Sequence, residues 1–114
     1  MAGQDDNYYH SHDLAKFGDM SKNATELGKK FFEWYGAVFA DGALTAREKS
    51  LMALAVAHAV QCPYCIDAYT NDAMEKGCDL DQLTEAAHVS AAIRGGASLV
   101  HGVQMRNIAT KKSM

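Results

Sequence analysis

Residues 44–77 are LTAREKSLMALAVAHAVQCPYCIDAYTNDAMEKG. Thr45 and Glu48 have the spacing of a capping box, which predicts that a helix opens there and runs to about Val60. The segment that follows ends at Gly77, a residue that readily adopts the left-handed conformation that stops a helix. The stretch therefore predicts two consecutive helices that meet at the motif Cys-Pro-Tyr-Cys.

The rest of the chain also favours helices, because Val, Ile and Thr never gather in the period-two runs that are typical of strands. Three further helices are predicted, over residues 13–20, 22–39 and 80–108. Gly95-Gly96 is expected to divide the last of them by a kink, a break or a close helix contact. Residues 1–12 are expected to form a loose N-terminal arm. We therefore predict an all-α fold of about five to six helices, in which residues 1–114 form a single domain.

The predicted helices carry more apolar surface than so short a chain can bury. From Leu51 onward, the helix before the motif is apolar nearly all round, which predicts burial on every side. The helix over residues 22–39 carries an apolar stripe from Ala24 to Val38. A chain of 114 residues has little other material to cover these surfaces. The sequence therefore predicts that the protein associates with copies of itself.

Charge balance and cysteine content limit the partners and the cellular location that we expect. Lys and Arg number 11 against 14 Asp and Glu, without a basic stripe, so nucleic acid is not an expected partner. The longest apolar stretch, from Leu51 to Val60, is too short to span a membrane, and the N-terminus lacks the pattern of a secretory signal. Three cysteines without a secretory context are typical of the reducing cytosol. We therefore expect a cytoplasmic protein that binds neither nucleic acid nor membranes.

Cys62 and Cys65 have the spacing of a redox-active dithiol. The two intervening residues let the sulfur atoms reach disulfide distance without opening the backbone. Pro63 fits the first helical position, and the N-terminus of a helix favours the thiolate form of a nearby cysteine. This effect favours Cys62 as the more acidic thiol. The pair is predicted to form a reversible intramolecular disulfide.

Two side chains lie one helical turn from the thiols. His58 precedes Cys62 by four residues, so the two share a face if the helix persists, and the imidazole could take the thiol proton. The alternative is a core histidine that donates to a carbonyl. Tyr69 follows Cys65 by four residues and could donate to a sulfur or to a peroxide oxygen. The alternative for Tyr69 is a packed aromatic ring with a hydrated hydroxyl.

Cys78 raises the question of a metal site. With Cys62, Cys65 and His58 it would complete a zinc set of three cysteines and one histidine, but the spacing is not that of a known zinc knuckle. Cys78 is instead predicted to be an inert thiol. We predict no metal site and no cofactor.

Residues 44–77, together with EAAHVSAAIRGGASLVHG at residues 85–102, resemble the carboxymuconolactone decarboxylase and alkyl hydroperoxidase D superfamily. Residues 32–35 and the segment AIRGGASLVHG look closest to small peroxidase-like proteins associated with arsenosugar biosynthesis. The resemblance implies an all-helical fold and assembly into trimers or hexamers. It also implies peroxidase or disulfide reductase chemistry that depends on the two cysteines.

The chain departs from this family at two positions. Hydroperoxidase members carry a glutamate where this chain has Ser50, and a histidine where it has Tyr69. Their proton relay therefore does not transfer, and His58 is the most plausible replacement base. The resemblance also implies that peroxide oxidises Cys65 and that Cys62 resolves the product. The decarboxylase branch lacks the redox-active cysteine pair, so the presence of this pair counts against lactone decarboxylation.

These observations favour a thiol oxidoreductase that acts on a small peroxide or disulfide. Peroxide would oxidise Cys65 to a sulfenic acid, Cys62 would condense with it, and a thiol reductant would restore both thiols. One alternative is a protein that binds a soft ion, zinc or trivalent arsenic, through the thiols without turnover. Another is a lyase related to carboxymuconolactone decarboxylase that keeps the pocket and uses His58 as its base.

Overall fold

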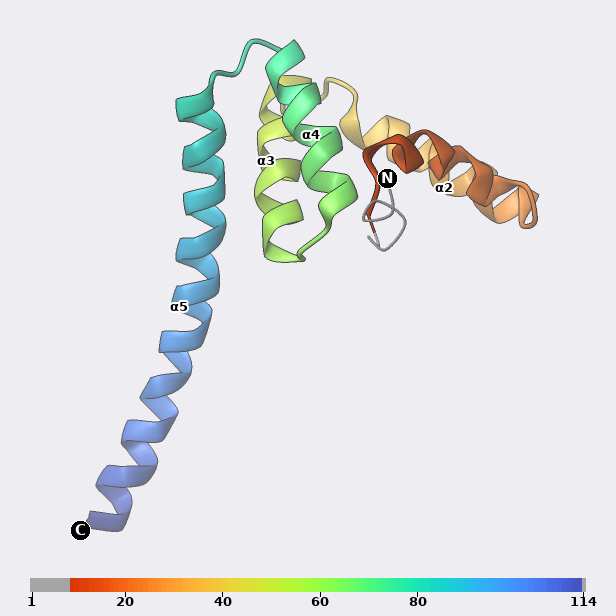
Figure 1. The fold of residues 1–114 in the computed structure, drawn as a ribbon. Coiled ribbons are helices and arrows are strands. Elements are labelled where there is room, and N and C mark those ends of the chain that lie inside the picture. Colours follow the sequence, from red (N-terminus) through yellow and green to blue (C-terminus); the bar gives the residue numbers. More distant parts are fainter. Residues whose placement is uncertain (1–8, 114) are drawn as a thin grey trace, which may run out of the picture.

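The computed structural model describes residues 9–113, which form five helices and, within that range, no strand (Figure 1). The elements are the 3-10 helix η1 (Ser11–Ser21) and the α-helices α2 (Thr25–Phe39), α3 (Ala46–Ala59), α4 (Pro63–Glu75) and α5 (Leu80–Ser113). The prediction of an all-α fold is confirmed. The assignment of the whole chain to a single domain stays a prediction.

Local signals place the ends of the central helices where the sequence predicts them. The Thr45 hydroxyl accepts the Glu48 N–H at 3.0 Å, and the Glu48 carboxylate accepts the Thr45 N–H at 2.8 Å. This reciprocal capping box satisfies backbone donors that have no partner inside α3. At the end of α4, Gly77 has a φ of 87°, a conformation that costs glycine little.

The core lies where α3, α4 and the first half of α5 pack together (Figure 1). Its buried cluster consists of small and aliphatic side chains: Leu54, Ala73, Cys78, Leu83 and Ala86. The cluster is small for a chain of 114 residues, so much of the apolar surface of the helices stays outside it.

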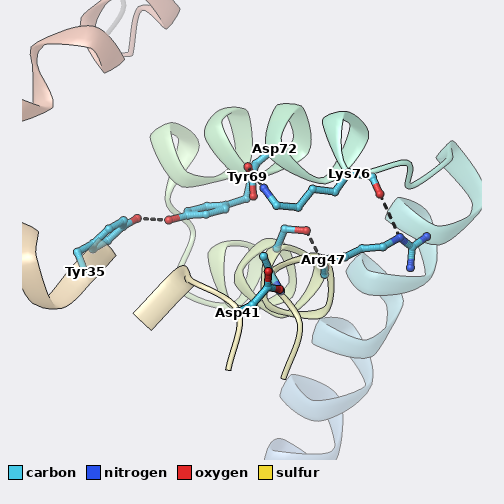
Figure 2. A network of polar contacts seen from close by, with 8 residues as sticks. Tyr35, Asp41, Arg47, Tyr69, Asp72 and Lys76 are labelled. Carbon is cyan, nitrogen blue, oxygen red and sulfur yellow. Dashed lines mark hydrogen bonds and ion pairs between the residues drawn. The ribbon is translucent and has the colours of Figure 1, made fainter. Parts of the chain in front are cut away.

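Arg47 ties the three core helices together through its guanidinium group. Its Nε donates to the Lys76 carbonyl at 3.2 Å (Figure 2), and its Nη2 donates to the Gln82 side chain at 3.1 Å. Lys76 in turn forms an ion pair with Asp72 on α4. A side chain of α3 therefore fixes the turn that connects α4 to α5.

The second half of α5 projects beyond the core (Figure 1). Ser90 is the last buried residue of this helix, and no residue from 91 to 113 is buried. The helix runs unbroken through Gly95-Gly96, so a break, which is one of the three expected outcomes, is wrong, whereas a close helix contact at these glycines stays a prediction. No neighbouring element forces a bend there, because a Cβ atom added at either glycine would meet nothing within 4 Å. Despite the length of α5, no helix among the described residues is both long and apolar enough to cross a membrane.

The burial of α3 on every side that the sequence predicts is not reached within a single chain. Leu54 and Ala57 are buried against α4 and α5, but Val56 is 59% exposed, and Met52 and Val60 are also exposed. The cause is the direction of α5, which covers one side of α3 and then leaves the body of the molecule (Figure 1). One side of α3 therefore has no cover within the described part of the chain.

Helices η1 and α2 pack against each other and extend away from α4 (Figure 1). Gly28 permits the close approach, because a Cβ atom there would lie 2.6 Å from the Cα of Ser21. The Phe17 ring meets the Phe32 ring edge-on at 5.0 Å between centroids. The predicted apolar stripe of α2 remains largely uncovered, and Trp34 is 63% exposed.

The prediction of a loose arm over residues 1–12 is wrong for its last part. Helix η1 begins at Ser11, and the Tyr9 and Ser11 hydroxyls both donate to the Asp67 carboxylate on α4. These contacts are made between residues more than fifty positions apart, so no local pattern indicates them. The rest of the predicted arm, residues 1–8, lies outside the described residues.

Loss of the capping box should lower the stability of the whole helical core. We expect Thr45→Ala to reduce the free energy of unfolding by about 1 kcal/mol, because the backbone N–H of Glu48 loses the hydroxyl that accepts it. The melting temperature, measured by circular dichroism, should fall by about 4 °C. Thr84→Ala removes an exposed hydroxyl that bonds within α5, and its effect should be smaller than about 0.5 kcal/mol. Equal effects of the two substitutions would contradict the capping role.

Candidate active site

The two cysteines of the motif lie at the junction of α3 and α4. The helix α3 ends at Ala59, and the chain turns at Gln61, which has a left-handed φ of 58°. Cys62 then caps α4, and its sulfur accepts the N–H of Cys65 at 3.2 Å. A negative charge on the Cys62 sulfur would be stabilised by this donor and by the positive end of the α4 dipole.

The geometry of the pair suits dithiol–disulfide chemistry. The Sγ atoms of Cys62 and Cys65 lie at disulfide distance, and the Cα atoms are 5.3 Å apart. Both residues are partly buried, whereas Cys78 is a free, buried cysteine of the core. Cys78 follows the C-terminal end of α4 and Cys62 precedes its N-terminal end, which separates them by roughly 20 Å along the helix. The two sulfurs of the motif are therefore placed to react with each other and not with Cys78.

A cavity of about 590 Å³ lies beside both sulfurs. One wall comes from η1, with Asp13, Leu14, Lys16, Phe17 and Met20. The opposite wall comes from α2 and α4, with Tyr35, Tyr64, Ala68 and Tyr69. Most of this lining is aliphatic or aromatic, so the cavity offers a thiol-reactive molecule an apolar environment next to the sulfurs.

A second cavity, of about 400 Å³, lies on the other side of Cys65. Its lining is mainly apolar and comes from the end of α2 and the uncovered side of α3: Val38, Phe39, Leu44, Met52, Val56 and Val60 are part of it. Cys65 and Tyr69 border both cavities, whereas Cys62 borders the first alone. Cys65 is therefore the cysteine of the pair that borders both cavities.

Tyr69 holds its hydroxyl inside the protein, in contrast to the alternative of a hydrated hydroxyl. It forms a hydrogen bond with the hydroxyl of Tyr35 on α2 (Figure 2), and its ring stacks on Phe39 at 5.0 Å between centroids. Burial, followed by the hydrogen bond with Tyr35, raises the pKa of Tyr69 far above its ordinary value. Tyr69 therefore stays protonated at neutral pH, where it can donate a hydrogen bond but cannot act as a base.

Tyr35 is a site residue that the sequence did not indicate. It lies 34 positions before Tyr69, within what reads as an ordinary apolar stripe of α2. Its hydroxyl nevertheless meets Tyr69, and its side chain lines the cavity beside the cysteines. The sequence carries no local signal for such a pair, because the pairing depends on how α2 packs against α4.

His58 does not share a helical face with Cys62, because α3 ends before the motif is reached. Its Nδ1 donates to the Leu54 carbonyl at 2.8 Å, as in the alternative of a core histidine. The imidazole lines a third cavity, of about 510 Å³, together with Pro63 and Asp67, and neither cysteine borders that cavity. The role of base predicted for His58 stays a prediction, without the geometric premise on which it was based.

Ser50 and the arrangement of possible metal ligands limit what the site can do. Ser50, at the position where the resemblance implies a glutamate, is fully buried and donates to the Arg47 carbonyl at 2.7 Å. Its hydroxyl is therefore already engaged within α3. Among residues 9–113, no three or more His, Cys, Asp or Glu side chains gather into a group that could hold a metal ion. A soft ion would therefore depend on Cys62 and Cys65 alone.

Comparison with known proteins relates this site to a family. The model of the carboxymuconolactone decarboxylase family matches residues 25–105. A protein of Paracoccus denitrificans, named uncharacterized protein 4 in cox locus, is 40% identical over 87 residues, which cover 76% of this chain and 78% of that protein. The narrower resemblance to proteins associated with arsenosugar biosynthesis stays a prediction.

Solved structures agree with this match. A protein from Methanobacterium thermoautotrophicum superposes with a TM-score of 0.72 and 32% identity, over 75% of this chain and 97% of that one. A carboxymuconolactone decarboxylase family protein from Legionella pneumophila superposes with a TM-score of 0.67 and 29% identity, over 82% of this chain and 84% of that one. The chain therefore belongs to the carboxymuconolactone decarboxylase family.

Proposed function

We propose that the protein is a thiol oxidoreductase that reduces a small peroxide or disulfide through Cys62 and Cys65. The observation that carries this proposal is the placement of the two sulfurs, at disulfide distance and beside an apolar cavity at the start of α4. Cysteine usage, with three cysteines in 114 residues and no disulfide framework, supports a cytoplasmic location, where thiols supply the reducing power. The reaction needs no metal ion or cofactor.

With a peroxide as substrate, the Cys65 thiolate attacks one peroxide oxygen and the O–O bond breaks. The other oxygen leaves with a proton as water or an alcohol, and Cys65 becomes a sulfenic acid. The Cys62 thiolate then attacks the Cys65 sulfur and the disulfide forms. The oxygen of the sulfenic acid takes up a proton and leaves as water. Two equivalents of a thiol reductant reduce the disulfide and restore both thiols.

The division of labour between the cysteines follows from their surroundings. Cys65 is assigned the attack because it borders both cavities and so meets substrate from either one. Cys62 is assigned the resolving step because the Cys65 N–H favours its thiolate, the form that must attack the sulfenic acid. Tyr69, held protonated by burial and by Tyr35, donates to the leaving oxygen.

Thiol counting tests the dithiol couple directly. Mild oxidation should remove two titratable thiols per chain, and peptide mapping should find Cys62 linked to Cys65 while Cys78 remains free. Cys62→Ser and Cys65→Ser should each abolish peroxide and disulfide turnover, whereas Cys78→Ala should keep it. A link between Cys62 and Cys78, or three thiols that persist, would overturn the assignment.

The same variants separate the other functions. A protein that only holds zinc or trivalent arsenic would bind the ion with the wild-type thiols and show no turnover of any peroxide or disulfide. A lyase of the decarboxylase type would keep its activity in Cys62→Ser and Cys65→Ser. A screen of peroxides, disulfides and lactones against the wild-type protein, Cys62→Ser and Cys65→Ser therefore distinguishes all three functions.

Alkylation at pH 7 tests which side chain assists the thiol. We expect Tyr69→Phe to slow the reaction of reduced Cys65 with iodoacetamide several-fold, because Tyr69 borders both cavities that Cys65 lines and its protonated hydroxyl can stabilise a thiolate there by donating a hydrogen bond. His58→Gln should have the smaller effect, because His58 faces another cavity and donates to Leu54. The opposite order of effects would assign the role of base to His58.

We also propose that the protein is a homo-oligomer, a trimer or a hexamer. The second half of α5 exposes large apolar side chains, and Leu99 is 80% exposed. No element of the described chain packs on this half, although water exposure of so much apolar surface is unfavourable. Gly95 and Gly96 leave space for a second helix to approach closely, and the uncovered side of α3 offers a further contact surface. A second copy of the chain, which carries the same surfaces, would cover both.

Light scattering coupled to size-exclusion chromatography should give several times the chain mass of 12.4 kDa at micromolar concentration. Leu99→Glu should shift the protein towards smaller species, because it places a charge on the exposed half of α5. Met74→Glu makes the same change on an exposed residue of α4 and serves as the matched control. A wild-type protein that elutes as a monomer would contradict the proposal.

A further inference from the structure

One wall of the cavity beside the cysteines lies outside the part of the chain that the family model matches. The match begins at residue 25, whereas η1 covers Ser11–Ser21. The lining contains three apolar side chains of η1: Leu14, Phe17 and Met20. This wall is therefore added to the matched region by the N-terminal segment of this chain.

The N-terminal end of this wall is attached to the helix that carries the cysteines. The Asp67 carboxylate accepts the hydroxyls of Tyr9 and Ser11, and it also accepts the Asn71 side chain at 2.8 Å. The Ser11 bond, followed by the Tyr9 bond, lowers the pKa of Asp67, so the acceptor is ionised at neutral pH. The Tyr9 ring also meets Tyr64, inside the cysteine motif, edge-on at 4.5 Å.

The C-terminal end of the wall is attached to α2. Ser21 packs against Gly28, and the Phe17 ring meets the rings of Phe32 at 5.0 Å and Tyr35 at 6.2 Å. Helix η1 is therefore held at both ends, by α4 through Asp67 and by α2 through aromatic contacts. A segment fixed in this way presents the same side chains to every molecule that enters the cavity.

The chemistry of the wall is apolar. Its two charged members, Asp13 and Lys16, pair with each other at 3.1 Å and so offer no net charge to a substrate. Leu14 and Met20 have no polar group to offer and gain from contact with an apolar surface. The wall therefore discriminates by contact area with the body of a substrate and not by hydrogen bonding to its reacting group.

We propose that η1 is the specificity-determining wall of the site, which selects thiol-reactive substrates that carry an apolar body next to the reacting group. The proposal rests on the proposed function for its biological meaning, but the selection itself precedes any redox step. It applies to every reagent that reaches the thiols through this cavity. It can therefore be measured without turnover.

The test compares two reagents that share a reacting group and differ in their bodies. Iodoacetamide and N-benzyliodoacetamide each alkylate the reduced protein at pH 7, and peptide mapping follows Cys62 and Cys65. The measured quantity is the ratio of the N-benzyliodoacetamide rate to the iodoacetamide rate. In Leu14→Ser/Met20→Ser this ratio should fall about ten-fold, because an apolar pocket that loses a few carbon atoms discriminates by at least this factor. The iodoacetamide rate should stay within about two-fold.

The wall variant has a control on α4, and a second variant with its own control tests the attachment of the wall to α4. Met74→Ser changes an exposed methionine of α4 that lines none of the three cavities, and it should keep the wild-type ratio. Asp67→Ala removes the acceptor that holds the start of the wall and should lower the ratio, whereas Glu75→Ala makes the same change of charge on α4 and should not.

The outcomes are separable from those of the proposed function. The proposal that η1 selects substrates is overturned by an unchanged rate ratio in Leu14→Ser/Met20→Ser, or by an equal fall of the ratio in Met74→Ser. An unchanged ratio in Asp67→Ala overturns the role of Asp67 as its anchor. Circular dichroism confirms that each variant is folded. Failure of the thiol oxidoreductase assignment would appear as absent turnover with the selective alkylation intact.

Discussion

The start of α4 joins the fold of this protein to its chemistry. There the N–H of Cys65 donates to the sulfur of Cys62 at 3.2 Å, and the same bond satisfies a helix terminus and favours a thiolate. Cys62 can cap the helix because the chain reverses at Gln61, immediately after α3. The positions of both sulfurs therefore depend on how α3 and α4 pack, and that packing is the part of the molecule with a buried core.

The environment of the sulfurs, in contrast, is built by elements distant in the sequence. Tyr35 from α2 and Tyr69 from α4 share a hydrogen bond, and Phe39 stacks on Tyr69. This cluster fixes a protonated phenol beside Cys65. A phenol of this kind donates a hydrogen bond but does not accept a proton. In the proposed mechanism Tyr69 therefore assists as a hydrogen-bond donor, and the helix terminus favours the thiolate of Cys62.

The sequence predicted those features of the structure that depend on a few neighbouring residues. The capping box at Thr45, the stop at Gly77 and the approach of the two cysteines each depend on a few neighbouring residues, and the structure contains all three. The contacts of Tyr35 and Asp67 were not predicted, because they depend on the packing of whole helices. A break in α5, one of the three outcomes expected at Gly95-Gly96, is absent for an energetic reason. Two glycines cost a helix about 2 kcal/mol, but a break would also interrupt a continuous series of backbone hydrogen bonds with nothing nearby to replace them.

The reactive cysteines and the wall proposed to select substrates lie on separate elements of this molecule. The sulfurs are placed by the junction of α3 and α4, within the region that the family model matches, whereas η1 lies before that region and contributes side chains to the cavity wall. Helix η1 contains no buried residue, so substitutions along it change little of the core. Substitutions in η1 can therefore change which molecules fit the cavity while the distance between the sulfurs stays the same.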